Sequence, residues 1–479
     1  MADVILRTVS AVITATTGNT QTITIPAAFG GGLPKAALVT CSFTAPDSTR
    51  LGNLQSYGIT DGITQTCTST GSVNAGTASD VYTDWRSDLI SGYTNDTTTT
   101  LFGAAEFTQF VPDGIQITVT ADFPVGAEAH FTLIGGADVT ARRETVSLTT
   151  NEEVVNLGYE PDLMFINTGV DITPAHSGIC NQSFGVVQNI AGVAKNYSQS
   201  SFGRAGRITM ENRGWLSDVY AMTRWSGTSF QTQLSLHTFT STGFSVTTVG
   251  TVRSFSTLTL EFASQPDIEL WHETIPISGD WTVTQPGFEP TWGLVAGMNI
   301  QSTFNDDSTT NRYGISLSMF DASVLGCISV SDRDAAGTSQ TDSSSTSYMQ
   351  EMKEDSLEGI YRTSTGHALT ADGWTISGLS QPESTSLGYA ICLAIGPGAA
   401  VTFDGPNIVP QTGTENALYT FDENAEGTVA SRFTGATTYA LAPGSDALPT
   451  GLTVNPTTGN IEGTPTEVAT RNITIRGSE

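Results

Sequence analysis

The sequence has 479 residues, a length that usually holds three or four domains, and its formal net charge is −28. A phosphate backbone repels so acidic a surface, so we expect no direct nucleic-acid binding. Glycine contributes 49 residues and Lys plus Arg only 19, a balance that, with frequent Thr and Ser, favours strands and tight turns over helices.

The N-terminus and the hydropathy of the chain disfavour secretion and membrane insertion. Met1-Ala2-Asp3-Val4 lacks a basic region followed by an apolar stretch, so we expect no secretory signal and synthesis in a cytoplasm. No apolar run approaches the roughly 20 residues of a membrane-spanning helix. We therefore expect no membrane insertion.

The first segments, taken in chain order, have the patterns of strands. Thr20–Ile25 places an apolar side chain at every second position, which is the period of a half-buried strand. Ala37–Cys41 is a nearly continuous apolar run, typical of a strand buried on both faces. Asp113-Gly114 then opens a predicted hairpin whose first strand alternates apolar and polar residues over 115–119.

The same plan recurs twice along the chain. A proline that precedes an apolar strand lies at positions 34, 161 and 290, in steps of 127 and 129 residues. The glycine of an aromatic-Gly pair at 58, 185 and 314 repeats both steps, and the hairpin glycine at 114, 243 and 373 recurs after 129 and 130 residues. Chance similarity would not keep this spacing, so the sequence predicts three copies of a domain-length unit.

The predicted fold class is all-β. Each copy is expected to form an antiparallel β-sandwich of jelly-roll-like type with a long variable excursion in its middle. The pattern changes after the linker Gly396–Ala400, where tight turn-strand units predict a smaller sandwich. The expected domains are residues 1–138, 139–268, 269–398 and 403–479.

The middle excursion of the second copy combines arginines with aromatic residues. This composition is typical of binding surfaces. The alternative is that the aromatic side chains belong to the core and the arginines line a strand edge. The candidate binding surface consists of Arg204, Arg207, Arg213, Trp215, Tyr220, Arg224 and Trp225.

The residue types that carry chemistry are scattered. No two of the five histidines have the spacing of a metal pair, and the five cysteines include no CxxC pair, so we expect no metal site and no disulfide framework. The sequence contains no nucleophile elbow, phosphate loop or dinucleotide motif. We therefore expect no cofactor and no catalytic residue, and we predict that the protein is not an enzyme.

Two acidic clusters leave calcium binding open as an alternative to the absence of a metal site. Asp306-Asp307 and Asp332-Arg333-Asp334 could supply oxygen ligands to calcium, although no twelve-residue calcium loop surrounds them. Solvated loop carboxylates are the other interpretation. A glycosidase needs only two carboxylates at the right separation, and the sequence singles out no pair.

The C-terminal segment resembles the bacterial Ig-like, cadherin-like modules of surface and phage proteins. The residues that carry this resemblance are Leu448–Val454, with the sequence LPTGLTV, and Thr457–Glu467, with the sequence TTGNIEGTPTE. The resemblance implies that residues 403–479 form an Ig-like β-sandwich.

The three copies resemble a β-domain of tailed-phage virion proteins. The motifs are the aromatic-x-Pro start, as in Phe288-Glu289-Pro290, the aromatic-Gly pair, and the Asp-Gly-aromatic hairpin, as in Asp372-Gly373-Trp374. The resemblance implies a structural or adhesive role in a virion that is associated with the capsid or the tail.

Three hypotheses about function follow. The first is a non-enzymatic structural protein of a phage virion that contacts other virion proteins and forms a homo-oligomer, since repeated folds present similar edges to similar neighbours. The second is a receptor-binding tail fibre that recognises host glycans. The third is a depolymerase of surface polysaccharide.

Overall fold

The computed structural model describes residues 4–44, 48–51, 54–73, 80–94, 101–168, 175–177, 179–204, 213–226, 229–250, 254–263, 266–298, 312–333, 339–344, 351–352, 360–362, 364–380, 388–397, 402–403, 419–420, 433–434, 438–442, 445–466, 473 and 475–478. Within these ranges every element is a β-strand, and the strands pair in antiparallel sheets. The all-β prediction is therefore confirmed.

The chain divides into two compact units. The larger comprises residues 3–396, and the smaller comprises residues 397–479 together with the first two residues of the chain. The division falls within the predicted linker at Gly396-Pro397.

The first repeat folds as two sheets packed face to face. Its large sheet has the order β1 (Ile5–Val12), β11 (Glu128–Gly135), β3 (Ala36–Cys41), β5 (Leu54–Thr60), β6 (Gln65–Val73) and β7 (Asp80–Arg86). Its small sheet has the order β2 (Thr20–Thr24), β10 (Gly114–Ala121), β9 (Leu101–Val111) and β8 (Ser91–Thr94). Alternate residues of both sheets meet in a core that includes Val39, Ile115, Ile117, Phe131 and Leu133.

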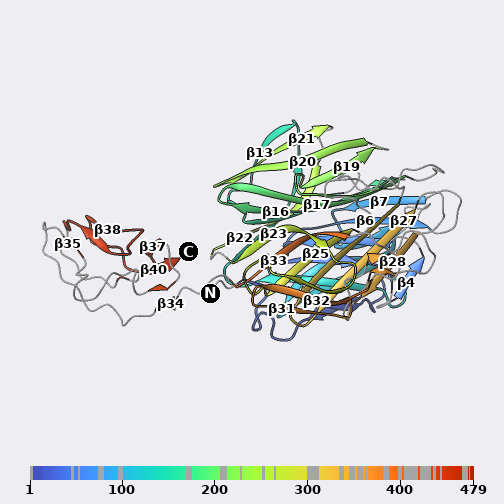
Figure 1. Ribbon diagram of the computed structural model, residues 1–479, viewed down its shortest axis with the longest axis horizontal. Helices are drawn as coiled ribbons and strands as arrows, with labels where there is room; N and C mark the ends of the chain where they lie inside the picture. The colour runs from blue at the N-terminus through green and yellow to red at the C-terminus, as the bar shows by residue number, and fades with distance from the viewer. Residues whose placement is uncertain are drawn as a thin grey trace. The chain divides into compact units, whose positions relative to one another are not determined.

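The second repeat has the same strand order. Its large sheet is β12 (Val139–Ser147), β22 (Ser254–Phe262), β14 (Leu163–Thr168), β16 (Ile179–Ile190), β17 (Val193–Arg204) and β18 (Arg213–Ser217). Its small sheet is β13 (Glu152–Asn156), β21 (Gly243–Gly250), β20 (Ser229–Thr240) and β19 (Met222–Ser226). The pair Val193–Thr238 joins β17 to β20, so the two sheets are continuous at this point. In Figure 1 this small sheet is the outermost layer at the top of the larger unit, above β16 and β17.

The third repeat follows the order again. Its large sheet is β23 (Ile268–Ile275), β33 (Gly388–Ile395), β25 (Trp292–Met298), β26 (Arg312–Asp321), β27 (Leu325–Arg333) and β28 (Ser339–Ser344). Its small sheet is β24 (Gly279–Val283), β32 (Gly373–Leu379) and β31 (Gly366–Thr370), and a separate pair joins β29 (Glu351–Met352) to β30 (Ile360–Arg362). The order shared by all three repeats shows one sandwich plan laid down three times.

The repeated proline and the hairpin glycine occupy equivalent places in the three sandwiches. Pro34, Pro161 and Pro290 each stand two residues before β3, β14 and β25. The hairpin glycines open β10, β21 and β32 under a carbonyl of the facing strand. A Cβ at Gly114 would lie 2.4 Å from the carbonyl oxygen of Ile23. The corresponding distances are 1.9 Å from Gly243 to Val155 and 2.2 Å from Gly373 to Val283. The close approach of two backbones therefore explains why glycine recurs.

The aromatic-Gly pair is equivalent in only two of the three copies. Gly58 pairs with Val39 and Gly185 with Ile166, each five residues after the repeated proline. In the third copy the residue at that place is Ser318, which pairs with Val295, so the predicted equivalence of Gly314 is wrong. Val295 and Ser318 are 23 positions apart, whereas Val39 and Gly58, like Ile166 and Gly185, are 19 apart. The third copy thus has four extra residues between these positions, and an unrelated Tyr-Gly pair falls at the spacing expected for the repeat.

The smaller unit contains short strand pairs. They are β34 (Thr402–Phe403) with β36 (Phe433–Thr434), β37 (Thr438–Leu441) with β40 (Ile475–Ser478), and β39 (Ile461–Gly463) between β35 (Tyr419–Thr420) and β38 (Leu452–Val454). The turn between β38 and β39 is held by Asn455, whose Oδ1 accepts hydrogen bonds from the amides of Thr457 and Thr458 at 2.9 and 3.2 Å.

A glycine substitution tests the close approach of the two sheets. In Gly185→Ala the new methyl group would lie 1.9 Å from the carbonyl oxygen of Ala221, so the sheets must separate. We expect the free energy of unfolding to fall by about 3 kcal/mol. Gly366→Ala is the matched control, because nothing lies within 4 Å of its Cβ position. Equal effects in chemical denaturation would contradict the packing described.

Candidate functional site

The surfaces between the three repeats hold the most specific polar contacts of the larger unit. At each junction, which we call a seam, a side chain of one repeat accepts a hydrogen bond from the first strand of the next. Asp61 Oδ2 accepts from the amide of Arg143 at 3.0 Å, and Gln188 Oε1 accepts from the amide of Leu270 at 3.1 Å. Asp321 Oδ2 accepts from the amide of Thr8 at 3.0 Å, which returns from the third repeat to the first. The three repeats therefore form a closed ring.

The strand register shows that the three amide donors are equivalent. Thr8 pairs with Thr132, Arg143 with Leu258 and Leu270 with Leu393. These partners in turn face residues that lie four positions after the repeated proline, namely Leu38, Phe165 and Leu294. The same contact therefore recurs at all three seams.

Two of the acceptors also shape the hairpin on which they lie. Asp61 Oδ1 accepts from the amides of Ile63 and Thr64 in the β5–β6 turn, at 3.0 and 2.7 Å. Asp321 Oδ1 accepts from the amides of Ser323 and Val324 in the β26–β27 turn, at 2.8 and 3.0 Å. One carboxylate oxygen thus folds the hairpin and the other binds the neighbouring repeat. In the second repeat the longer hairpin β16–β17 carries a glutamine instead.

Further buried side chains close the seams. Between the first and second repeats, Gln55 donates to Gln182 Oε1 at 3.0 Å, and Asn167 donates to the carbonyl of Tyr57 at 2.7 Å. Between the second and third, Gln199 donates to the carbonyl of Gly297 at 2.7 Å. Because these groups are buried, leaving any of them without its partner would cost free energy.

The seam between the third and first repeats also buries ionisable and aromatic groups. Trp292 donates to Thr8 Oγ1 at 3.1 Å. His130 Nδ1 lies 2.7 Å from Ser10 Oγ, and its Nε2 lies 3.9 Å from a carboxylate oxygen of Glu128. His130 packs so closely on Gly326 that a Cβ there would approach its ring to 2.6 Å.

Strands also cross from one repeat into the sheet of another. β15 (Ala175–Ser177), from the second repeat, pairs with β7 at the edge of the first repeat's large sheet. β4 (Ser48–Leu51), from the first repeat, pairs with β28 in the third. Both strands lie in equivalent connections: β4 lies between β3 and β5, and β15 lies between β14 and β16. The corresponding residues of the third repeat, 299–311, lie outside the described residues.

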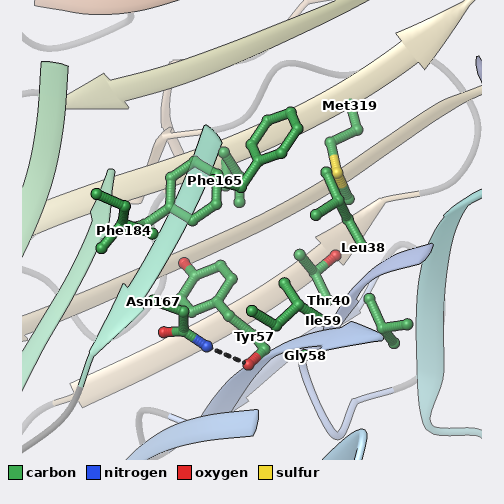
Figure 2. Close-up of a pocket in the computed structure, with 12 residues that line it drawn as sticks. Leu38, Thr40, Tyr57, Gly58, Ile59, Phe165, Asn167, Phe184 and Met319 are labelled. Carbon is green, nitrogen blue, oxygen red and sulfur yellow. Dashed lines mark hydrogen bonds between the residues drawn. The ribbon is translucent and has the colours of Figure 1, made fainter. Parts of the chain in front are cut away.

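A small cavity lies where all three repeats meet (Figure 2). Its volume is about 10 Å³, enough for about one water molecule. Its lining comes from all three repeats and is mainly apolar; Figure 2 labels Leu38, Thr40, Tyr57, Gly58, Ile59, Phe165, Asn167, Phe184 and Met319. A small-molecule site needs several hundred Å³, so this cavity is a packing defect of the ring centre.

The structure describes the side chains of only some residues of the predicted arginine and aromatic surface. Trp215 is buried on β18 and packs with Phe202, and Arg224 is buried on β19. Tyr220 is half-buried between these strands. Arg204, Arg213 and Trp225 lie in strands but outside the described side chains, and Arg207 lies outside the described residues. Trp215 and Arg224 are thus buried in the packed sandwich, and the binding surface as a whole stays a prediction.

The described titratable groups form no cluster of metal-ligating side chains. No group of three or more His, Cys, Asp or Glu among them could hold a metal ion. Asp306, Asp307 and Asp334 lie outside the described residues, as does the side chain of Asp332. Among the described residues, no helix is long and apolar enough to cross a membrane.

Comparison with known proteins identifies the smaller unit only. Residues 401–478 match a family model, He_PIG, described as "Putative Ig domain". No curated protein matches the chain. Together with the short antiparallel strand pairs, the match shows that the C-terminal module is an Ig-like domain. The match covers less than half of the chain.

The sequence did not identify Asp61, Gln188 and Asp321 as acceptors at the seams. Asp61 and Asp321 each precede a tight turn, which is a recognisable signal for a hairpin cap. The mistaken register at Gly314 concealed their equivalence, and nothing in the sequence indicated that the second oxygen reaches another repeat.

Removing the carboxylate of Asp321 tests the seam that closes the ring. Asp321→Ala would leave the buried amide of Thr8 without its acceptor, and we expect the free energy of unfolding to fall by about 3 kcal/mol. Hydrogen exchange at the Thr8 amide should accelerate. Asp280→Ala is the control, because its Oδ1 accepts only within the third repeat, from Gly378 at 2.9 Å. Unchanged protection of Thr8 in the Asp321 variant would contradict the seam.

Thiol reactivity tests the burial of the core. Burial raises the pKa of the Cys41 thiol to about 12, and it also raises the pKa of the Cys67 and Cys392 thiols. We expect these cysteines and the buried Cys327 to resist iodoacetamide in the native protein near pH 8 and to react after denaturation. Peptide mass spectrometry resolves each site. Rapid native labelling of Cys41 would contradict its placement.

Proposed function

We propose that the protein is a non-enzymatic structural protein of a tailed-phage virion, associated with the capsid or the tail, that provides assembly contacts. The observation that carries this proposal is the closed ring of three sandwiches. The sandwiches share buried polar seams and exchange strands, so the ring is suited to act as one block. Such a construction serves mechanical stability in an assembly, where a chain must keep its shape under load.

The composition and the sequence motifs agree with this role. The aromatic-x-Pro starts and the Asp-Gly hairpins resemble those of tailed-phage virion β-domains. The C-terminal Ig-like module is of a kind found on phage and bacterial surface proteins. The net charge of −28 keeps a crowded assembly soluble through mutual repulsion.

Adhesion to host glycans is the second candidate function, and the direction of the strands favours it. β3 and β6 end, and β5, β7 and β9 begin, at one end of the first sandwich. The longer connections of that repeat therefore leave from this end, opposite the β5–β6 turn. Loops carried at one end of a rigid scaffold are a common arrangement for recognition.

Analysis of purified virions tests the structural role. We expect the protein to be found in intact particles in many copies by quantitative mass spectrometry, and reconstruction of the particle should place it on the capsid or the tail. Absence from washed particles would contradict a virion role. Confinement to the tip of the tail would favour the receptor-binding alternative.

A separate assay with purified protein tests the depolymerase hypothesis. Purified protein is incubated with host surface polysaccharide, and chain length is followed by size-exclusion chromatography. The structural proposal expects no shortening, whereas measurable shortening would establish an enzyme.

A further inference from the structure

The second repeat exposes most of the large apolar side chains that the described part of the larger unit leaves in solvent. The exposed fractions are 68% for Val154, 61% for Val193, 58% for Val249, 51% for Val219 and 46% for Ile190. The first repeat contributes only Leu33, Ile63 and Val125. Exposed apolar residues that are scattered singly need no explanation, but a group on one face indicates a contact.

Strand pairing places three of these side chains on one face. Ile190 pairs with Val193, which pairs with Thr238 on β20. The hydroxyls of Thr238 and Ser245 lie 2.7 Å apart, and Ser245 pairs with Val154 on β13. Residues paired in antiparallel strands project from the same side of the sheet. Ile190, Val193, Thr238, Ser245 and Val154 therefore form a row that begins on the β16–β17 hairpin of the large sheet and continues across the small sheet, and we call this row the valine face.

Neighbouring rows extend the valine face. Val249 pairs with Gln233, and it lies four residues after Ser245 on β21, so it projects to the same side. Ser235 pairs with Thr247, and its hydroxyl donates to the carbonyl of Val219 at 3.1 Å. Figure 1 shows this sheet, β13, β21 and β20, as the outer layer of the unit.

The other two repeats provide an internal comparison. Val154 pairs with the residue two positions after the hairpin glycine Gly243. The residues in that place in the first and third repeats are Thr22 and Thr282, which pair with Gln116 and Thr375. The same sandwich thus folds with threonine at this position. The fold therefore does not require a valine at this position.

We propose that the valine face is an interface at which two copies of this chain pack sheet against sheet. Copies that carry −28 each repel one another, so contact between them is favoured where the surface charge is low. Among the residues that pair in these rows, Glu152 is the one acidic side chain, opposite Thr247. A sheet face of valine, threonine and serine can pack on its own copy about a two-fold axis, as sheets pack in β-sandwiches. This proposal does not depend on the proposed virion role, because sedimentation tests the interface and analysis of virions tests the role.

Sedimentation velocity of the full chain over a range of concentrations tests the interface. We expect a dimer that forms with rising concentration and tightens as salt screens the repulsion. Val154→Thr combined with Val193→Thr should raise the dimer dissociation constant at least tenfold and leave the thermal unfolding temperature nearly unchanged, because both side chains are exposed.

Val125→Thr is the matched control, since this residue is fully exposed in a turn of the first repeat, and it should leave the dissociation constant unchanged. A wild-type chain that stays monomeric at about 100 μM, weaker than the micromolar to nanomolar range of specific complexes, would overturn the proposal. So would a double variant that dimerises as well as the wild type. If the valine face instead binds a different partner, the wild-type chain would stay monomeric.

Discussion

One hydrogen bond, repeated three times, determines how the larger unit is built. A side chain near a hairpin turn of one sandwich accepts the amide of the first strand of the next sandwich, through Asp61, Gln188 and Asp321. Two of these contacts join repeats that follow one another in the chain. The third joins the last repeat to the first and, together with the pairing of β4 with β28, closes the ring.

The ring buries polar side chains on the outer faces of the large sheets, among them Thr40, Gln55, Gln182 and Gln199. In a repeat standing alone these side chains would face water, so their burial costs free energy unless they find partners across the seams. In the ring, Gln182 and Asn167 form hydrogen bonds with the first repeat, and Gln199 with the third. Strands β4 and β15 cover sheet edges that would otherwise pair with other chains. The ring therefore supplies partners to some of the buried polar side chains and covers two sheet edges.

The sequence predicted the sandwiches well because their signals are local. Alternating apolar residues predicted strands, and glycines that face a neighbouring carbonyl, such as Gly243, kept an exact position through the duplication. The seams could not be predicted, because a turn-capping aspartate looks the same whether or not its second oxygen reaches another domain. The register error at Gly314 has a similar origin. A short motif carries no record of an insertion upstream of it.

The arginine and aromatic surface shows the same limit. Composition cannot tell a recognition patch from a sandwich core, and Trp215 and Arg224 are buried. The valine face, in contrast, becomes visible only when the repeats are compared position by position. Val154 stands where Thr22 and Thr282 stand, and this requires the structural register.

The distance between the first and third repeats tests the ring most directly. Spin labels are placed on the full chain at Arg7, beside the amide donor Thr8, and at Ala322, in the hairpin turn after Asp321. Double electron–electron resonance then measures their separation. The ring predicts a short, narrow distance, although the two positions are far apart in sequence. An open row of three domains, each about 35 Å across, would give a separation above roughly 50 Å or a broad distribution, and that result would contradict the account.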